Sequence, residues 1–298
     1  MFNAASKSRF LKLLLVAAWP LLSAAPLHAQ TLQPYKDNLF AYKRITANLM
    51  GGDFTVVEYS KQRDLRDRDK IDEREVDRRY VSMKPKRSQD DYKLKINGRV
   101  LSYMGVGKAR GGASVVVIYI HGQGGNRFQG MNDLSFGGNF NRIKNLMVRN
   151  NGAFISTDVP SFDAKGTQDI ANLIADQKRR SPQAKVIVAC GSMGNIICWN
   201  LIKNRRTASL LGGIMVLGGP KDPGFLRSGA LGRNVPLFIG HGSKDSVYDW
   251  ESMANFFKRI KSAAPNYPAK FTLFETGSHG TPIRMTDWRL VLNWMLSH

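Results

Sequence analysis

The chain has 298 residues, of which 43% are hydrophobic and 22% are charged, and this composition is typical of a folded globular protein. Its length fits one large α/β domain, and its formal net charge is +21. The sequence lacks zinc-finger spacing, aromatic-interleaved basic motifs and a nucleotide-binding fingerprint, which argues against nucleic-acid readers and nucleotide-dependent enzymes. Neither a cofactor nor a metal is expected.

The first 29 residues have the layout of a secretory signal peptide. A basic opening precedes an apolar stretch over residues 13–25, and the small residue Ala29 ends the leader. This stretch is shorter than the roughly 20 residues that a membrane-spanning helix needs. We therefore expect cleavage near Ala29 and a periplasmic or secreted protein, with a retained membrane anchor as the alternative.

The mature chain is expected to remain strongly basic. Loss of Lys7, Arg9 and Lys12 with the leader lowers the net charge from +21 to +18. Such a charge attracts anionic surfaces, including phospholipid headgroups or a cell envelope, through long-range forces that salt weakens. Residues 61–87 hold the densest run of charges, and their mixed signs predict a solvated, ion-paired surface.

The chain before residue 105 predicts a short strand extension, over about residues 50–105. Its β-type runs are residues 54–59, 80–83 and 94–103. We expect these strands to form an antiparallel entry to a larger sheet.

From residue 114 onward, short apolar runs alternate with segments of helical periodicity. The expected strands are residues 114–120, 152–157, 185–189, 213–217, 235–239 and 270–274. The expected helices are residues 139–149, 166–179, 194–203, 250–261 and 282–296. This alternation predicts an α/β fold in which helices cover both faces of a mostly parallel sheet. Ligand chemistry should gather at the carboxyl ends of its strands.

Four of the expected strands are followed by loops whose side chains or amides carry chemistry. These are the Gly-rich stretch beginning at His121, the Ser192 corner, the loop that holds Asp245 and the loop that holds His279. Each loop alone is common turn chemistry. Their joint occurrence at one edge of a parallel sheet predicts a single site.

The order of these loops resembles the α/β-hydrolase superfamily, where a serine on a strand-turn-helix corner is followed by an acid and then a histidine. The corner here is Cys190-Gly-Ser-Met-Gly194, which departs from the usual Gly-x-Ser-x-Gly only at Cys190. The resemblance covers about residues 114–298. It implies an α/β-hydrolase fold, with residues 30–298 forming a single domain.

A serine hydroxyl becomes a useful nucleophile when a neighbouring base takes its proton, and imidazole suits this role near neutral pH. The sequence has five histidines. His28 lies in the leader and His298 is the last residue, while His121 and His241 precede glycines at strand ends and more often shape a loop. His279 is therefore the expected base for Ser192, and its late position is also where the family places its base.

Asp245 is the expected acid, which would orient the imidazole and stabilise the imidazolium. Asp222 is the alternative acid, and Asp158 also competes because both follow strands. The oxyanion hole is expected from the backbone N–H of Met193 and from Gln123. Met193 also opens a helix, whose positive dipole end favours a developing negative charge.

The segment from Gly218 to Asn234 is too short for a large cap, so we expect Ser192 to be open to small-molecule or surface-presented esters. Phe225, Leu226 and Leu231 are candidates for one wall of the site. The main hypothesis is an exported serine hydrolase that cleaves carboxylic esters through an acyl-enzyme intermediate. The alternatives are a non-catalytic protein that binds polyanions or the envelope, and an acyltransferase or peptidase with the same triad.

The two cysteines of the chain, Cys190 and Cys198, flank the serine corner. A bridge between them is sterically conceivable in an oxidising compartment. We expect two buried free thiols instead, because cysteine is among the most buried residue types.

Overall fold

The computed structural model describes residue 1 and residues 31–96 and 98–298. Most of the predicted leader falls on residues 2–30, which lie outside the described residues, so the leader stays a prediction. Within the described ranges, no helix combines the length and the apolar character needed to cross a bilayer.

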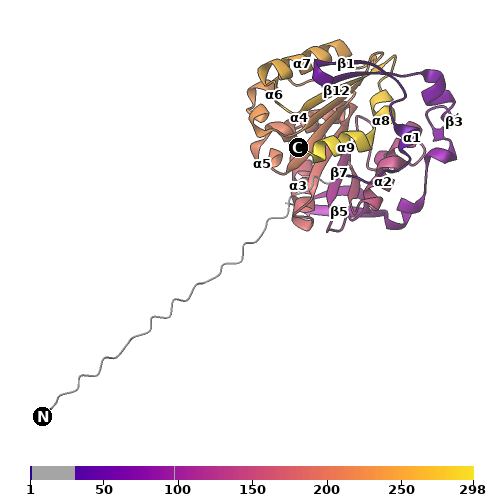
Figure 1. The fold of residues 1–298 in the computed structure, drawn as a ribbon. Helices are drawn as coiled ribbons and strands as arrows, with labels where there is room; N and C mark the ends of the chain where they lie inside the picture. The colour runs from indigo at the N-terminus through magenta and orange to yellow at the C-terminus, as the bar shows by residue number, and fades with distance from the viewer. Residues whose placement is uncertain (2–30, 97) are drawn as a thin grey trace.

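A ten-stranded sheet forms the centre of the molecule (Figure 1). Its strands are β1 (Ile45–Leu49), β2 (Phe54–Glu58), β5 (Asp90–Ile96), β6 (Arg99–Gly107), β7 (Val115–Ile120), β8 (Ala153–Thr157), β9 (Lys185–Gly191), β10 (Leu211–Leu217), β11 (Leu237–Gly242) and β12 (Ala269–Glu275). They lie in the order β1-β2-β12-β11-β10-β9-β7-β8-β6-β5. The strands from β2 to β8 in this order are parallel, which confirms the predicted mostly parallel sheet.

The parallel strands are apolar throughout because both faces of the sheet are covered. In β7, Val116 and Ile118 point into one core, whereas Val117 and Tyr119 point into the other. Side chains of a strand alternate between faces, so a strand between two helical layers needs apolar residues at every position. The continuous apolar runs in the sequence reflect this double burial.

The helices form two layers, one on each face of the sheet. They are α1 (Asp37–Phe40), α2 (Asn139–Arg149), α3 (Ala164–Arg180), α4 (Asn195–Lys203), α5 (Arg205–Ala208), α6 (Gly224–Arg227), α7 (Trp250–Ala263), α8 (Thr281–Met285) and α9 (Trp288–Leu296). Buried side chains of α3, α4 and α7 share one core, and those of α2, α8 and α9 share the other. The single helix predicted over residues 282–296 is two helices, because Thr286 leaves helical geometry and Asp287 caps α9 through the amide of Leu290.

The predicted antiparallel entry is wrong in its arrangement. β2 lies parallel to β12 near one edge of the sheet, whereas the β5–β6 hairpin lies at the opposite edge (Figure 1). The run over residues 94–103 is part of two strands, and residues 80–83 form none. A β-type run indicates a half-buried extended segment, but it carries no information about which strand will be its partner.

Cys190 and Cys198 form a disulfide, so the expectation of two free thiols is wrong. The tight corner after β9 turns α4 back along that strand and leaves the two Cα atoms 6.2 Å apart. This separation lies within the range that a disulfide spans. The tendency of cysteine to be buried does not indicate whether two cysteines are bonded. Here α4 runs back along β9 and brings the two buried sulfur atoms together.

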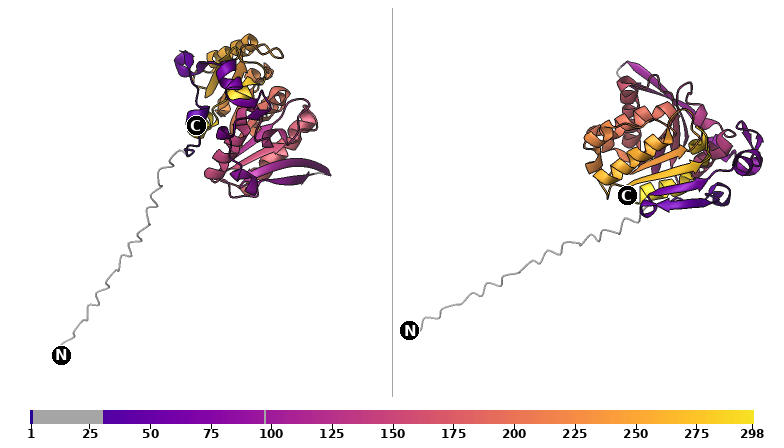
Figure 2. Two further views of the ribbon diagram at one scale, coloured as in Figure 1. Left: turned by 90° about the vertical axis from the view of Figure 1, so that its right-hand side faces the viewer. Right: turned by 90° about the horizontal axis from the view of Figure 1, so that it is seen from above.

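The charged segment over residues 61–87 lies against the side of the sheet domain near α8 (Figure 2). It contains the π-turn η2 (Gln62–Arg66) and a hairpin of β3 (Asp69–Ile71) and β4 (Glu75–Val76). The expectation of a solvated surface is wrong for part of it, since Asp64, Arg68 and Asp69 are buried. Burial is tolerated because the charges have partners: Arg284 of α8, for example, makes two bonds to the carboxylate of Asp69.

Candidate functional site

Ser192 lies at a strained corner between β9 and α4, in a short 3-10 turn, η7 (Ser192–Gly194). Its backbone φ is 51°, a left-handed value that residues with side chains rarely adopt. The flanking glycines are needed for space. A Cβ at Gly191 would lie 2.8 Å from the Tyr119 hydroxyl, and one at Gly194 would lie 2.5 Å from the His121 carbonyl oxygen. The corner therefore holds the serine in a conformation fixed by its surroundings.

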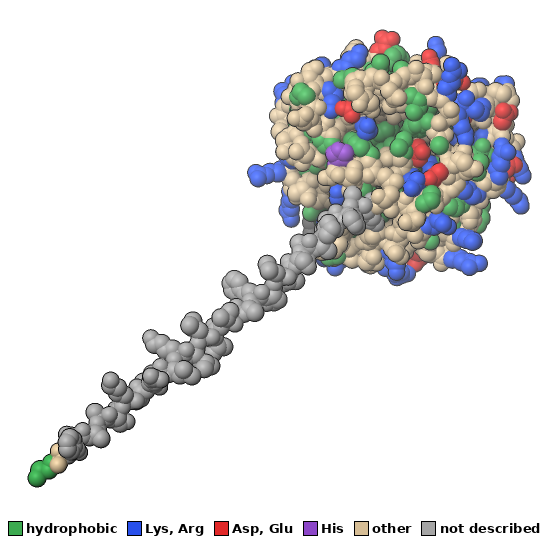
Figure 3. Space-filling view, viewed as in Figure 1, with side chains coloured by type: hydrophobic (Ala, Val, Ile, Leu, Met, Phe, Trp, Pro, Cys, Tyr) green, Lys and Arg blue, Asp and Glu red, His purple; other side chains and the backbone are tan. Residues whose placement is uncertain are grey.

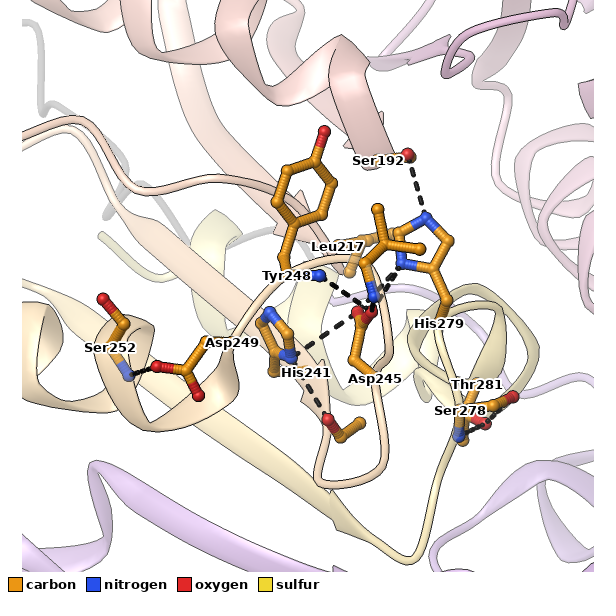
Figure 4. A network of polar contacts seen from close by, with 12 residues as sticks. Ser192, Leu217, His241, Asp245, Tyr248, Asp249, Ser252, Ser278, His279 and Thr281 are labelled. Carbon is orange, nitrogen blue, oxygen red and sulfur yellow. Dashed lines mark hydrogen bonds and ion pairs between the residues drawn. The ribbon is translucent and has the colours of Figure 1, made fainter.

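Three predicted site residues form one hydrogen-bonded chain (Figure 4). His279 Nε2 lies 2.9 Å from Ser192 Oγ. His279 Nδ1 lies 2.9 Å from Asp245 Oδ2 and 3.1 Å from its Oδ1. The residues follow β9, β11 and β12, whose carboxyl ends share one edge of the sheet. The fold thus brings distant parts of the chain into contact at the edge where ligand chemistry was expected.

The carboxylate of Asp245 is buried yet held in its charged form. Burial by itself raises the pKa of Asp245, but hydrogen bonds from His279 and from the amides of Tyr248 and Val247 outweigh that effect and leave the pKa below its ordinary value. The two amides donate to Oδ1 at 3.1 and 2.8 Å. A fixed negative charge beside Nδ1 keeps the proton there and leaves Nε2 able to accept one.

The other two candidate acids are engaged elsewhere. Asp222 forms an ion pair with Lys203 and accepts a hydrogen bond from the amide of Gly224. Asp158 accepts hydrogen bonds from the backbone and the guanidinium of Arg127. Asp245 is the acid that the structure places against His279.

The two histidines that precede glycines shape loops, as expected. His121 Nδ1 lies 2.7 Å from the carbonyl oxygen of Gly122, and its Nε2 accepts the amide of Val159 at 3.2 Å. His241 is completely buried, and its Nδ1 lies 3.2 Å from the carbonyl oxygen of Gly242 and 3.8 Å from Asp245 Oδ2. Burial lowers the pKa of His241, so this ring is held neutral behind the acid.

The Gly-rich loop after β7 passes directly beside the serine. A Cβ at Gly122 would lie 2.7 Å from Ser192 Cβ, so only glycine permits this approach. The amide of Gly125 closes the loop on the carbonyl of Gly122 at 3.1 Å, which leaves Gln123 exposed at its tip. Met193 follows the serine in η7, one residue before the turn ends, and α4 begins only at Asn195.

Several solved structures share this architecture. An esterase from Pyrococcus furiosus has a TM-score of 0.52 at 17% identity, covering 72% of this chain and 95% of its own. A thermostable esterase has a TM-score of 0.57 at 13% identity, over 71% of this chain and 63% of that one. An alpha-beta serine hydrolase homologue from Coxiella burnetii has a TM-score of 0.50 at 16% identity, over 68% and 95%. The chain has the α/β-hydrolase fold. No protein-family model and no curated protein sequence matches it.

The wall predicted for this α/β-hydrolase fold is wrong. Phe225 is completely buried and packs against Trp199, with ring centroids 5.3 Å apart. Leu226 and Leu231 pack against the same core. These apolar side chains therefore pack on the core: Phe225 is fully buried, and Leu226 and Leu231 are partly buried.

A pocket of about 330 Å³ instead adjoins His279, and sequence reasoning missed its walls. Tyr59, Glu73 and Phe136 come from parts of the chain that precede the serine corner. No motif marks these residues, because their place depends on how the charged segment packs. Tyr248 was missed too, and its ring lies 5.8 Å from that of His279. Its position three residues after Asp245 was the available signal, since its amide caps that carboxylate.

Within the described part of the chain, no group of three or more His, Cys, Asp or Glu side chains is placed to hold a metal ion.

Proposed function

We propose that this protein is an exported serine hydrolase that cleaves carboxylic esters through an acyl-enzyme intermediate. The observation that carries the proposal is the hydrogen-bonded chain from Ser192 through His279 to Asp245. The similarity to two esterases and a serine hydrolase homologue adds support at the level of the fold.

The proposed reaction uses these groups in two steps. His279 Nε2 accepts the hydroxyl proton while Ser192 Oγ attacks the ester carbonyl carbon, and Asp245 stabilises the resulting imidazolium. The backbone amides of Met193 and Gln123 would stabilise the oxyanion. The intermediate collapses with cleavage of the C–O bond, and the leaving alcohol takes the proton from Nε2. Water, activated by the same imidazole, then releases the acid and regenerates the hydroxyl.

Export is supported by two independent features of the chain. The basic and apolar pattern of residues 1–29 is that of a secretory leader. The Cys190–Cys198 disulfide is suited to an oxidising compartment such as the periplasm or the extracellular medium. In such a compartment, the site would encounter small-molecule or surface-presented esters.

Fluorophosphonate labelling tests for the activated serine. Wild-type protein should be labelled at Ser192 and should hydrolyse short-chain p-nitrophenyl esters, whereas Ser192→Ala should do neither. Asp245→Asn should lower kcat by about 10⁴-fold, because the neutral amide no longer fixes the required tautomer. Asp222→Asn is the matched control and should keep kcat within a few-fold of wild type. A folded wild-type protein that never labels would contradict the proposal and favour a binding protein on this scaffold.

A further inference from the structure

The pocket of about 330 Å³ adjoins His279, the residue that would protonate the alcohol leaving from an ester. In the proposed reaction, on which this inference rests, His279 Nε2 must protonate the leaving oxygen, so that oxygen lies next to the imidazole. The pocket is lined by His279 itself and by its neighbours Ser278, Gly280 and Thr281. This pocket is therefore a candidate for holding the group attached to the leaving oxygen.

The pocket wall also carries a negative charge, from Glu73. Glu73 lies in the turn between β3 and β4 and is exposed. None of the ion pairs found in the described ranges uses its carboxylate. Its amide donates to Asp69 Oδ2 at 2.8 Å, the oxygen that also accepts from Arg284, so the turn is tied to α8.

The positive charges nearby are paired or lie outside the pocket. Arg284 lines it, but its side chain is 5% exposed and its guanidinium bonds both oxygens of Asp69 at 3.1 and 2.5 Å. Arg68 is buried and donates to the carbonyl of Gly137 rather than lining the pocket. The positive charge of Arg68 weakens the attraction of the pocket for a cation without abolishing it. We therefore expect a moderate preference for cationic over neutral substrates.

Two aromatic side chains complete the wall. Tyr59 and Phe136 line the pocket together with Glu73. Aromatic rings beside a carboxylate are the usual surroundings of a bound ammonium group, since the ring face attracts a cation. Phe136 and Glu73 also have left-handed backbone, with φ of 48° and 63°. Such strain in residues with side chains tends to gather at ligand sites.

We propose that this pocket is the leaving-group subsite and that it favours esters whose alcohol part carries a cationic ammonium group. Tyr59, Phe136 and Glu73 are its specificity-determining residues. The acyl part lies outside this pocket and is not constrained by it.

A pair of phosphonothioates with a cationic and a neutral leaving group tests the subsite independently of the acyl group. One carries a thiocholine leaving group, and the other carries the uncharged analogue with carbon in place of nitrogen. Ser192 Oγ forms a bond to phosphorus, the P–S bond breaks, and the thiolate leaves with the proton that His279 took from the hydroxyl. Each rate constant is divided by that of the same reagent with hydroxide, because the ammonium group also makes the thiol a better leaving group. At low salt, the normalised rate constant for inactivation of wild-type protein should be about tenfold larger for the cationic reagent than for the neutral one.

Glu73→Gln should bring the ratio of the two normalised rate constants close to one, chiefly by slowing the reaction of the cationic reagent. Glu75→Gln, the same substitution two residues away and outside the pocket, should retain the wild-type ratio. Equal normalised rate constants with wild type, or a ratio that Glu73→Gln does not alter, would overturn the subsite. So would a protein that a fluorophosphonate labels but neither phosphonothioate attacks. Failure of the fluorophosphonate to label Ser192 would contradict the proposed hydrolase function instead.

Discussion

Two histidines face the carboxylate of Asp245, and their surroundings separate their roles. His279 is partly exposed and bonds both Asp245 and Ser192, whereas His241 is buried on the other side of the acid. The buried Nε2 of His241 has no hydrogen-bond partner among the described residues. A protonated His241 would place a charge where water cannot reach it, so burial makes this residue a structural one that must stay neutral.

Because His241 is buried in its neutral form, the free energy of unfolding depends on pH. Its folded pKa lies below the ordinary 6.5, so below that pH the unfolded chain binds a proton that the folded chain refuses. The free energy of unfolding should therefore fall as pH drops below 6.5, by up to about 1.4 kcal/mol for each pH unit. Asp245 acts in a lower window, because its folded pKa lies below 3.8 and its contribution is lost only in stronger acid.

Urea unfolding at pH 7.5 and pH 5.5 measures this effect. His241→Asn, which retains a polar group for the carbonyl of Gly242, should lose less stability between the two pH values than wild type. His298→Asn removes an exposed histidine and should behave as wild type. An equal pH dependence in wild type and His241→Asn would show that another group titrates in this window.

At the scale of elements, the disulfide links the strand before Ser192 to the helix after it. Cys190 and Cys198 are eight residues apart, and a bridge of this loop length stabilises a protein by about 2.5 kcal/mol through the unfolded state. Reducing agent should therefore lower the free energy of urea unfolding of wild type by about this amount. Thiol titration of denatured, unreduced protein should find no free thiol.

The Cys190→Ala/Cys198→Ala double variant is the control, because its unfolding should be insensitive to reducing agent. The activity of this variant shows whether the disulfide is also needed to hold Ser192 in its position. Two titratable thiols in unreduced wild type would refute the disulfide.

The sequence predicted those elements whose signal is local. The parallel strands and their loops were found because each buried strand is a continuous apolar run, and the order of Ser192, Asp245 and His279 is legible without coordinates. Contacts between distant segments were not found. The partner of β2, the disulfide and the burial of Asp69 all depend on which elements pack together, and no local pattern encodes that choice. The pocket wall at Tyr59 and Glu73 was missed for the same reason.

At the scale of the whole molecule, positive charge is spread widely over the surface. Lys and Arg side chains outnumber Asp and Glu on the face in Figure 3 and lie mainly around its edges. The chain has 44 basic and 23 acidic residues, so attraction to a polyanion should arise from the summed field of many side chains. We therefore propose an anionic envelope surface as a partner that concentrates the protein without engaging the site.

Salt dependence separates this attraction from a specific binding site. Mature protein should be retained on heparin and on anionic vesicles at low salt and released well below 1 M NaCl, because the Debye length shrinks from about 10 Å at 0.1 M to about 3 Å at 1 M. Over the same range, kcat/KM for a small neutral ester should stay nearly constant, since the three residues of the site touch one another and are not screened. Neutral vesicles are the control and should not retain the protein. Retention that persists at high salt would contradict attraction by the summed field and would indicate a discrete polyanion-binding site on the surface.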